Sequence, residues 1–318
     1  MPNPLALAID IGGTKVETAL VDDNGRIVPQ SRHRLPTGRD LDAHGLGLAL
    51  EKCLTASTAQ SGGALFVGAG IGSAGPVDLT AGKILPKNMP YLHGFDVRAF
   101  VRDLVPGCPV ELRLDGTCLA LAEHWIGATR GTSSSMSIVV STGVGGGIML
   151  DGRIVFGRSG NAGHIGQIHL DSSNDGSPDG GTLEGIASGL RSVVWARSHG
   201  WTGQTGEDLG RSALAGDATA IAAIRRSATA VGRAIANVAT LLDLEAVAVG
   251  GGFSHVSPTY LEIVRESAVH HAVFDYSRDI AIRSSGLGSD GPLVGAAALI
   301  HRPHLIRHPD EVTLAAIL

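Results

Sequence analysis

The sequence predicts an α/β protein with two lobes, and three observations lead to that prediction. Apolar strands alternate along the chain with segments of helical periodicity, the order expected for mixed sheets flanked by helices. Two glycine-rich turns, at residues 10–15 and 141–147, each follow an apolar strand. The length of 318 residues is sufficient for two domains with separate hydrophobic cores.

The first half of the chain has the elements of an opening sheet. The Asn24-Gly25 step between two apolar runs predicts a hairpin. Leu46, Leu50 and Leu54 recur at intervals of four, which predicts an amphipathic helix. The expected elements are strands at 5–9, 16–21, 26–28, 64–71 and 110–114, a helix within 40–60, and a helix ending at Trp125.

The second half repeats this plan. Its expected elements are strands at 136–140, 147–150, 153–156 and 246–249, a helix from 183, and a long helix over 217–242. A third glycine turn, at 250–252, follows the last of these strands. It has two interpretations of equal weight, a strand-to-helix corner or a close approach of the backbone to the base or ribose of a nucleotide.

Composition and charge exclude several classes of protein. The net charge of -5 and the lack of clustered Lys and Arg argue against a nucleic-acid partner. No segment approaches the roughly 20 uninterrupted apolar residues that span a bilayer, and the N-terminus lacks the pattern of a secretory signal. We therefore expect a cytoplasmic protein with no membrane partner, and a homodimer remains open.

The first glycine turn has the composition of a phosphate site. Gly12 and Gly13 lack Cβ atoms, so their N–H groups can approach an anion closely, and Thr14 and Lys15 add a hydroxyl group and a positive charge. Asp10 would repel a polyphosphate unless a divalent cation lay between them. It is therefore predicted to anchor Mg²⁺ through water.

The second glycine turn supplies further N–H donors, with Thr142, Gly143 and Gly145 as the candidate contacts. Either turn alone has the alternative interpretation of an ordinary tight turn. The presence of both, with Asp10 in the first, favours two parts of one phosphate site.

Asp115 follows a predicted strand, at the position where open α/β sheets bind ligands. One interpretation makes it the N-cap of the following helix. The other makes it the general base that takes a proton from a hydroxyl group during phosphoryl transfer. The phosphate turns strengthen the second interpretation, and both stay open at this point.

Five motifs give the chain a resemblance to the ROK family of sugar kinases. They are the phosphate motifs at 10–15 and 141–147, a sugar-side loop at 70–78, an adenosine motif at 249–252 and a closing helix at 291–298. The resemblance implies the two-lobed actin-like ATPase (ribonuclease H-like) fold with a cleft between the lobes. It also implies a smaller lobe of residues 1–115 with 290–318 and a larger lobe of residues 116–289.

The same resemblance implies an activity and assigns roles. A chain similar to these kinases transfers the γ-phosphoryl group of Mg-ATP to a sugar, most often to the 6-hydroxyl group, with Asp115 as the catalytic base. Glu184 falls on a sugar-binding glutamate of the family. The remaining expected contacts are Gly75 and Asn88 for the sugar and Gly250 and Gly251 for the nucleotide.

Three positions that bear on the substrate depart from the common family pattern. Leu114 stands where the family usually has an Asn that bonds a sugar hydroxyl group, so that contact cannot form. His164 replaces a Glu and Gln167 replaces a His. A neutral imidazole can donate a hydrogen bond, so His164 could donate to an acyl carbonyl group. The stretches 162–166 and 141–147 most resemble the N-acetylmannosamine kinases of the family, which makes that sugar our best hypothesis.

The family's structural zinc site is not expected in this chain. Many members bind Zn²⁺ with a His and three closely spaced cysteines, but the stretch 171–181 contains no cysteine, and Gln167 occupies the His position. An improvised site from His169 with Asp171 or Asp175 is disfavoured, because carboxylates are poor ligands for closed zinc sites. Local turns made by the Asp, Asn, Ser and Gly side chains are the preferred interpretation.

Other functions remain as alternatives. One is a glucokinase or another hexose kinase of the same family. A second is a sugar-sensing regulator, but regulators of the family carry a DNA-binding region before the first phosphate motif, and here the first strand is expected at Leu5. A third is a sugar-binding protein without catalysis, against which the presence of Asp10 and Asp115 argues.

Overall fold

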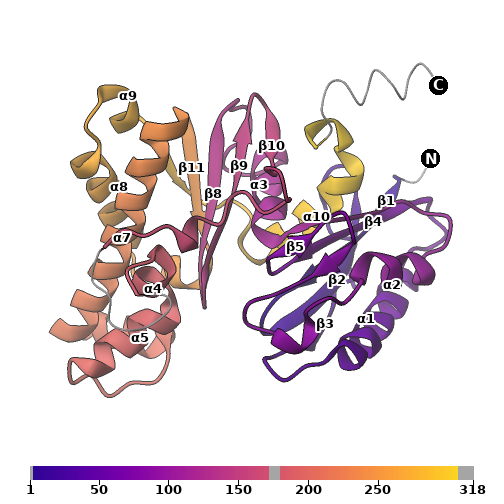
Figure 1. Cartoon of the computed structure of the whole chain (residues 1–318), viewed down its shortest axis with the longest axis horizontal. Helices are drawn as coiled ribbons and strands as arrows, with labels where there is room; N and C mark the ends of the chain where they lie inside the picture. The colour runs from indigo at the N-terminus through magenta and orange to yellow at the C-terminus, as the bar shows by residue number, and fades with distance from the viewer. Residues whose placement is uncertain (1–2, 172–179, 307–318) are drawn as a thin grey trace. The chain divides into compact units, whose positions relative to one another are not determined.

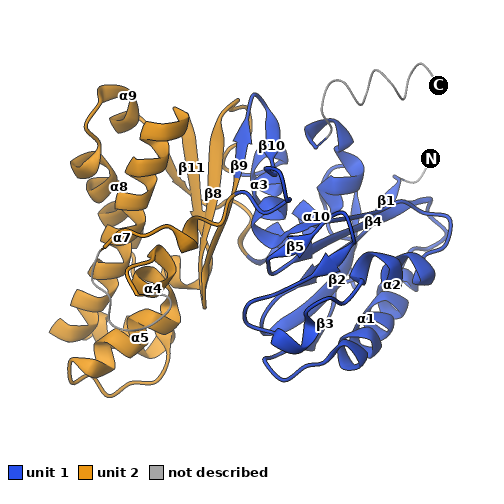
Figure 2. Cartoon of the chain, viewed as in Figure 1, with its two compact units in different colours: residues 1–127, 148–162, 289–318 blue, residues 128–147, 163–288 orange. Residues whose placement is uncertain are grey.

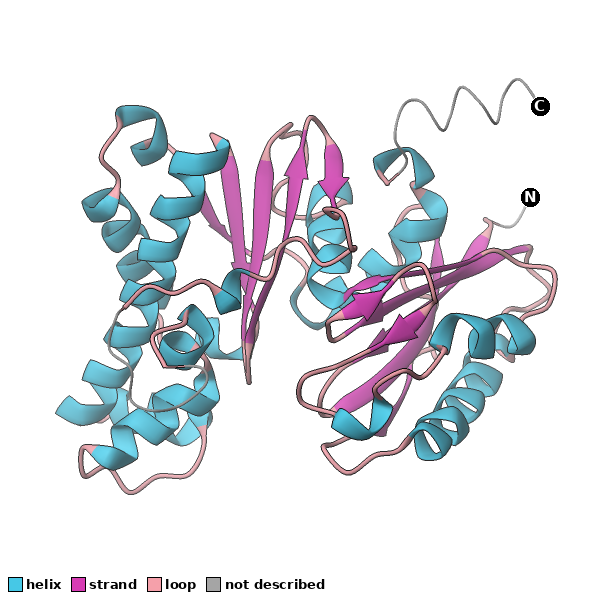
Figure 3. Cartoon of the chain, in the orientation of Figure 1, coloured by secondary structure: helices cyan, strands magenta, loops and turns pink. Residues whose placement is uncertain are grey.

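The chain forms two five-stranded sheets, each of which packs against helices (Figures 1 and 3). The structure is a computed structural model that describes residues 3–171 and 180–306. Its contacts divide the chain into two units (Figure 2). Unit 1 contains Met1–Gly127, Ile148–Ala162 and Ser289–Leu318, and unit 2 contains Ala128–Gly147 and Gly163–Gly288.

The sheet of unit 1 has the strand order β3-β2-β1-β4-β7. Its strands are β1 (Leu5–Ile11), β2 (Lys15–Asp22), β3 (His33–Pro36), β4 (Phe66–Ser73) and β7 (Val110–Leu114). The pairs β1–β2 and β2–β3 are antiparallel, whereas β4 runs parallel to β1 and β7 runs parallel to β4. The mixed sheet predicted for this half of the chain is therefore confirmed.

Helices cover both faces of this sheet, and β1 is therefore buried on both sides. Leu7 and Ile9 belong to the core that includes α1 and α2, whereas Ala6 and Ala8 belong to the core that includes α3 and α10. The helices are α1 (Ala43–Thr58), α2 (Val97–Leu104), α3 (Asp115–Trp125) and α10 (Gly291–His301). Because side chains alternate along a strand, Asp10 lies on the same face as Ala6 and Ala8.

The helices α3 and α10 pack backbone against backbone. A Cβ atom on Gly295 of α10 would lie 1.8 Å from the carbonyl oxygen of Cys118 in α3, so only glycine fits there. This close approach explains the glycine in the predicted closing helix at 291–298.

Shorter elements complete unit 1. They are the hairpin β5 (Val77–Asp78) with β6 (Lys83–Ile84), the strand β10 (Arg153–Val155), and 3₁₀ turns at Pro90–Leu92, Gly288–Asp290 and Pro303–Leu305. The strand β9 (Val144–Leu150) runs through the division between the units and pairs with β10 in an antiparallel ladder.

The second sheet has the strand order β10-β9-β8-β11-β12, with β8 (Ser135–Val140), β11 (Ala246–Gly250) and β12 (Ala281–Ser284) in unit 2. The helices of unit 2 are α4 (Leu183–Ala187), α5 (Gly189–Ser198), α6 (Gly206–Leu214), α7 (Ala218–Leu242), α8 (Tyr260–His271) and α9 (Asp275–Arg278). Two 3₁₀ turns lie at Ile165–Gln167 and Gly252–His255.

The structure corrects two details of the predicted elements. The stretch 26–28 is not a strand, since only Ile27 bridges to Val21, and the next strand is β3. Pro29 has no N–H group to extend a ladder, and Gln30 has a φ of 63°, which ends the pairing. The glycine turn expected over 141–147 is restricted to its first three residues, because β9 begins at Val144.

None of the helices in the described part of the chain is long and apolar enough to cross a membrane.

Candidate active site

Asp10 lies at the centre of a charged cluster in unit 1. It is the sixth residue of β1, and it pairs with Glu17 of β2 on one side and with Gly72 of β4 on the other. Residues paired across an antiparallel ladder share one face of the sheet, so Asp10 and Glu17 point toward the layer of α3 and α10. Asp10 is only 7% exposed.

The environment of Asp10 favours its protonated form. Burial is the main cause, and the nearby charges of Asp115 and Glu17 add to it, so that the pKa of Asp10 rises to about 7. Lys15 and Arg32 act in the opposite direction and lower the pKa of Asp10. A carboxyl group held next to other carboxylates in this way suits a position that binds a cation.

Asp115 is the first residue of α3, and Leu114 occupies the N-cap position. The Oδ1 atom of Asp115 accepts a hydrogen bond of 2.7 Å from the backbone N–H of Gly116. The interpretation of Asp115 as an N-cap is therefore wrong. A carboxylate in the first turn is stabilised by the helix dipole, and here it lies close enough to Asp10 to raise the pKa of that residue.

Leu114 precedes Asp115, but its side chain packs on the side of the sheet that α1 and α2 cover. Leu114 is 2% exposed and belongs to the core on that side. The side chain at this position therefore contributes to packing in unit 1.

The turn between β1 and β2 is fixed by hydrogen bonds to three of its carbonyl groups. The carbonyl oxygen of Gly12 accepts from Thr37 Oγ1 at 2.7 Å, that of Thr14 accepts from the Thr37 N–H at 3.0 Å, and that of Lys15 accepts from the Gly12 N–H at 2.9 Å. Among the described residues, the N–H groups of Gly13 and Thr14 have no hydrogen-bond partner. Exposed N–H groups on a fixed turn form an anion site.

Thr37 donates two hydrogen bonds to the turn, and the loss of one of them should have a measurable effect. Thr37→Val removes the hydroxyl donor and keeps the N–H donor, so the KM for a phosphate-bearing substrate should rise about 3- to 10-fold, the range for one net hydrogen bond. Thr58→Val is the matched control, since it removes a similar bond to the Leu54 carbonyl group within α1. Equal effects of the two substitutions on the KM would contradict a special role of the Thr37 bond.

Lys15 is held by Glu17 in this structure. The Lys15 ammonium group forms a short ion pair with Glu17 Oε2, and Arg32 Nε donates to Glu17 Oε1 at 3.0 Å. Burial acts to raise the pKa of Glu17, but the hydrogen bonds and charges of Lys15 and Arg32 hold that pKa below its usual value. Glu17 is therefore ionised and paired near Asp10.

The loop at 70–78 of unit 1 contains Gly75 and lies close to Asn88, two of the predicted residues. The carbonyl oxygen of Gly75 accepts from the Lys87 N–H at 3.1 Å, which places the neighbouring Asn88 close to the loop. The Ala74 N–H donates to the Ile11 carbonyl oxygen at 2.9 Å, so this loop is also tied to the end of β1. Asn88 itself is exposed and open to solvent.

In unit 2 the carboxylate of Glu184 fixes the second glycine turn. Its Oε2 atom accepts from the Val144 N–H at 2.9 Å, and its Oε1 atom accepts from Gln167 Nε2 at 3.1 Å. A Cβ atom on Gly143 would lie 2.6 Å from Glu184 Oε2, so a larger residue there would have to displace the Glu184 carboxylate. Gln167, which replaces the usual His, thus serves as a partner of Glu184.

His164 stands on a loop that packs against β9. A Cβ atom on Gly163 would lie 2.6 Å from the Gly146 carbonyl oxygen, and Gly163 has a φ of 101°, so both contact and conformation require glycine. Gly145 of β9 has open space where a Cβ would be, and Thr142 is exposed. The structure therefore groups Thr142, Gly145 and His164 around the β8–β9 end of unit 2.

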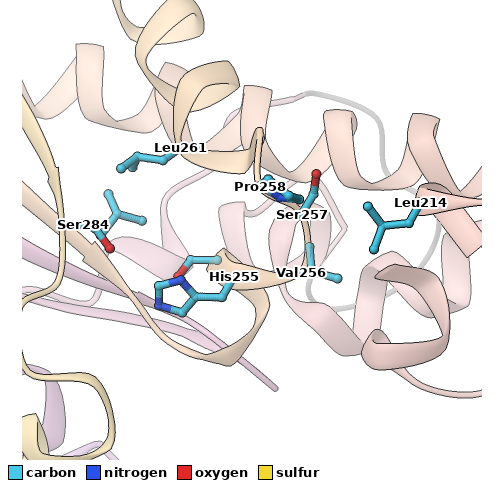
Figure 4. Close-up of a pocket in the computed structure, with 9 residues that line it drawn as sticks. Leu214, His255, Val256, Ser257, Pro258, Leu261 and Ser284 are labelled. Atoms are coloured by element: carbon cyan, nitrogen blue, oxygen red, sulfur yellow. The ribbon is translucent and has the colours of Figure 1, made fainter. Parts of the chain in front are cut away.

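The third glycine turn borders a pocket of about 450 Å³ in unit 2 (Figure 4). Gly250 ends β11 and Gly251 has a φ of 93°, with its Cβ position only 2.5 Å from the Val140 carbonyl oxygen. The pocket wall is built from the end of β11, the Gly252–His255 turn and the start of α8. The lining residues are Leu214, Val249, Ser254, His255, Val256, Ser257, Pro258, Leu261 and Ser284.

The expectation about zinc stays a prediction. Asp175 and most of the stretch that replaces the family's cysteines lie outside the described residues. Across residues 3–171 and 180–306, no group of three or more His, Cys, Asp or Glu side chains is arranged to hold a metal ion. His169 bridges to Thr182 through the backbone, which gives it a place in the local turn.

Sequence reasoning missed Glu17, Arg32 and Thr37 as residues of this site. An available signal for Glu17 was its position in an apolar strand, where a carboxylate needs a partner. Nothing in the sequence connects Arg32 or Thr37 to the glycine turn, since both reach it only through the pairing of β3 with β2.

Comparison with known proteins places this geometry in a family. A family model described as the ROK family matches residues 6–303. The N-acetylmannosamine kinase of Citrobacter koseri is 34% identical over 296 residues, which covers 92% of this chain and 97% of that protein. The N-acetylmannosamine kinase of Yersinia pestis is 34% identical over 264 residues, with 81% and 86% of the two chains covered.

Solved structures agree with this placement. The ROK hexokinase from Thermus thermophilus superposes with a TM-score of 0.81 at 29% identity, covering 94% of this chain and 99% of that one. A ROK family glucokinase from Streptomyces griseus, in complex with glucose and AMPPNP, has a TM-score of 0.80, 29% identity and the same coverage. The predicted actin-like ATPase fold is confirmed, and the chain belongs to the ROK family.

Proposed function

We propose that this protein transfers the γ-phosphoryl group of ATP to the 6-hydroxyl group of an N-acetylhexosamine, with N-acetylmannosamine as the preferred sugar. Kinases of the ROK family that act on sugars provide the reaction class. The proposed sugar rests on relatives at 34% identity that are named N-acetylmannosamine kinase, and on the resemblance of the 162–166 stretch to those enzymes.

The observation that supports this function most strongly is the proximity of Asp115 to Asp10 at the head of α3. Phosphoryl transfer needs a base near the attacking hydroxyl group and a centre that compensates phosphate charge. Asp115 lies at the N-terminus of a helix and stays accessible, whereas Asp10 is buried beside the glycine turn. The two carboxylates thus have different environments and are proposed to have different roles.

In the proposed reaction, Asp115 accepts the proton of the sugar hydroxyl group as its oxygen attacks the γ-phosphorus atom. The bond between that phosphorus and the β–γ bridging oxygen breaks, and ADP leaves. The N–H groups of Gly13 and Thr14 bind phosphate oxygens, and Gly12 keeps the turn closed through its bond to Lys15. Each of these groups belongs to unit 1.

The residues present fit a magnesium ion. Asp10 is a buried carboxyl group whose pKa is raised by burial and by Asp115, and a cation would relieve that cost. Asp10 is proposed to hold Mg²⁺ through water. When bound, the ion would neutralise charge on the ATP phosphates. Structural zinc is not proposed.

Unit 2 is proposed to recognise the sugar ring and the nucleotide base. His164 donates to the acyl carbonyl group, and Glu184 accepts from sugar hydroxyl groups while Gln167 and the Val144 N–H fix its orientation. Thr142, Gly143 and Gly145 bind phosphate, and the pocket beside Gly250 and Gly251 takes the base of ATP. Gly75 and Asn88 of unit 1 are further sugar contacts.

The function is tested by ADP release from purified protein with a panel of sugars. N-acetylmannosamine, N-acetylglucosamine, glucose, mannose and fructose are each supplied with ATP and Mg²⁺, and kcat/KM is measured for each. We expect the highest value with N-acetylmannosamine. A much higher value with glucose would overturn the proposed sugar, and no ADP release with any sugar would overturn the kinase assignment.

The role of His164 can be tested separately. His164→Ala should raise the KM for N-acetylmannosamine about tenfold and leave the KM for glucose nearly unchanged, because glucose has no acyl group to accept the bond. His44→Ala is the control, since His44 is an exposed residue of α1. Equal effects on both sugars would argue against the proposed contact.

A glucokinase activity is the second candidate. It is favoured by the similarity to the Streptomyces griseus glucokinase, whose structure contains glucose and AMPPNP. The sugar panel distinguishes the two candidates directly.

A further inference from the structure

Glu17 has more positive partners than one buried carboxylate needs. It is 2% exposed, and its oxygens contact Lys15, Arg32 at 3.0 Å and Arg34 at 3.1 Å. Its partner across the β1–β2 ladder is Asp10. Three cations around one carboxylate, on the face that holds Asp10, indicate a role beyond stabilising the strand.

The three cations are held with different strength. Arg32 donates hydrogen bonds to Glu17, to Asp290 Oδ1 at 2.6 Å and to the Ser289 carbonyl oxygen at 2.8 Å. Arg32 and Arg34 therefore still pair with Glu17 if Lys15 leaves, and the cost of an unpaired buried carboxylate does not arise. Lys15, by contrast, pairs with Glu17, and its side chain is 37% exposed.

The position of Lys15 allows it to bind an anion when it leaves Glu17. It follows directly after Gly13 and Thr14, whose N–H groups have no hydrogen-bond partner among the described residues, and its charge already acts on Asp10. A lysine that must order its long side chain on binding an anion loses rotamer freedom, which weakens binding. Pairing with Glu17 removes part of that freedom before the anion arrives.

We infer that Glu17 is a positioning residue. It keeps the Lys15 ammonium group beside the glycine turn until that group binds the phosphates of ATP, and Arg32 then compensates the negative charge of Glu17. This inference rests on the proposed function, in which ATP is the phosphoryl donor. It assigns no contact between Glu17 and either substrate.

The first test is Glu17→Gln, which keeps the shape and removes the charge. Without the carboxylate, Lys15, Arg32 and Arg34 repel one another and Lys15 is no longer held. The KM for ATP should rise about tenfold, whereas kcat and the KM for the sugar should change less than about twofold. Glu17→Asp keeps the charge and should restore most of the affinity for ATP.

The matched control is Glu111→Gln, which removes a carboxylate that pairs with Arg113 at 3.2 Å on β7 of the same unit. It should leave the KM for ATP unchanged. Thermal unfolding of each variant identifies a loss of folded protein, and the KM values are compared only at temperatures at which all variants are folded.

A second pair of variants separates positioning from a general structural role. In the Lys15→Met background, Glu17→Gln should have no further effect on the KM for ATP, because the group that Glu17 positions is missing. A tenfold rise in both backgrounds, or no rise in either, would overturn the inference. An unchanged KM for ATP in Glu17→Gln alone would do the same.

Failure of this inference is distinguishable from failure of the proposed function. If the wild-type protein releases no ADP with any sugar, the kinase assignment fails. If the wild type is active and the four variants at positions 15 and 17 behave independently, only the role of Glu17 is rejected.

Discussion

Replacing Asp115 by Asn should lower kcat about 10²- to 10⁴-fold, the range expected when a general base is removed. Asn keeps the size of the side chain, and its amide oxygen can still accept the 2.7 Å hydrogen bond from the Gly116 N–H. The helix α3 and its packing against α10 should therefore remain. What Asn cannot do is take the proton from the sugar hydroxyl group.

The measurement is kcat from ADP release at saturating sugar and ATP, with KM values determined for both substrates. Since the substitution acts on the chemical step, both KM values should change little. Asp103→Asn, on the exposed side of α2, is the control and should be as active as the wild type. A near-normal kcat in the Asp115 variant would exclude the residue as the base.

Much of this fold could be predicted from the sequence because its patterns are local. The period-four leucines of α1, the apolar run of β4 and the long helix α7 each specify an element without reference to distant residues. The resemblance of the motifs to a known family then supplied what periodicity cannot, the actin-like topology. The comparisons confirm both the family and the fold.

The predictions were wrong where pairing depends on the tertiary structure. The Asn24-Gly25 step does make a turn, in which the Gly25 N–H donates to Asp22, but the chain after it pairs only through Ile27. The sequence predicts a turn at Gly145 and Gly146 and a strand only from Gly147. All three glycines are part of β9, where a Cβ on Gly146 would lie 2.8 Å from the Ser137 carbonyl oxygen.

The site itself could be predicted only in part, for the same reason. Asp10, Asp115 and the glycine turns stand out because each follows a strand. The residues that hold them do not stand out, since Thr37 and Arg32 act across strand pairings. Asp115 shows the limit most clearly. Its sequence position, taken by itself, favours an N-cap, and only the start of α3 at Asp115, with Leu114 at the cap, decides against that role.

Replacing Asp10 by Asn should abolish most of the activity and at the same time stabilise the folded protein at alkaline pH. The two effects have one cause. The buried carboxylate is costly without a cation, because burial and the charges of Asp115 and Glu17 raise its pKa from 3.8 to about 7. A shift of this size corresponds to at most about 4 kcal/mol, at about 1.4 kcal/mol for each pH unit. A neutral amide avoids that cost and offers magnesium no charge.

The raised pKa of Asp10 determines how its contribution to stability changes with pH. A raised pKa means that the folded state binds the proton more tightly than the unfolded state, so the favourable contribution of Asp10 is complete below pH 3.8. It declines as pH rises and is lost above about pH 7. The Asn variant has no such dependence, so its advantage over the wild type should be smaller near pH 5 and largest near pH 8.

Thermal unfolding without added Mg²⁺, at pH 5 and pH 8, measures this difference. We expect the Asn variant to unfold several degrees above the wild type at pH 8, with a clearly smaller difference at pH 5. Asp40→Asn, at an exposed position before α1, should show no such difference. Added Mg²⁺ should narrow the gap at pH 8 by stabilising only the wild type, since binding to the folded state raises its stability. An Asn variant that is less stable than the wild type at pH 8, or one that keeps full activity, would show that Asp10 serves the fold and does not hold the metal.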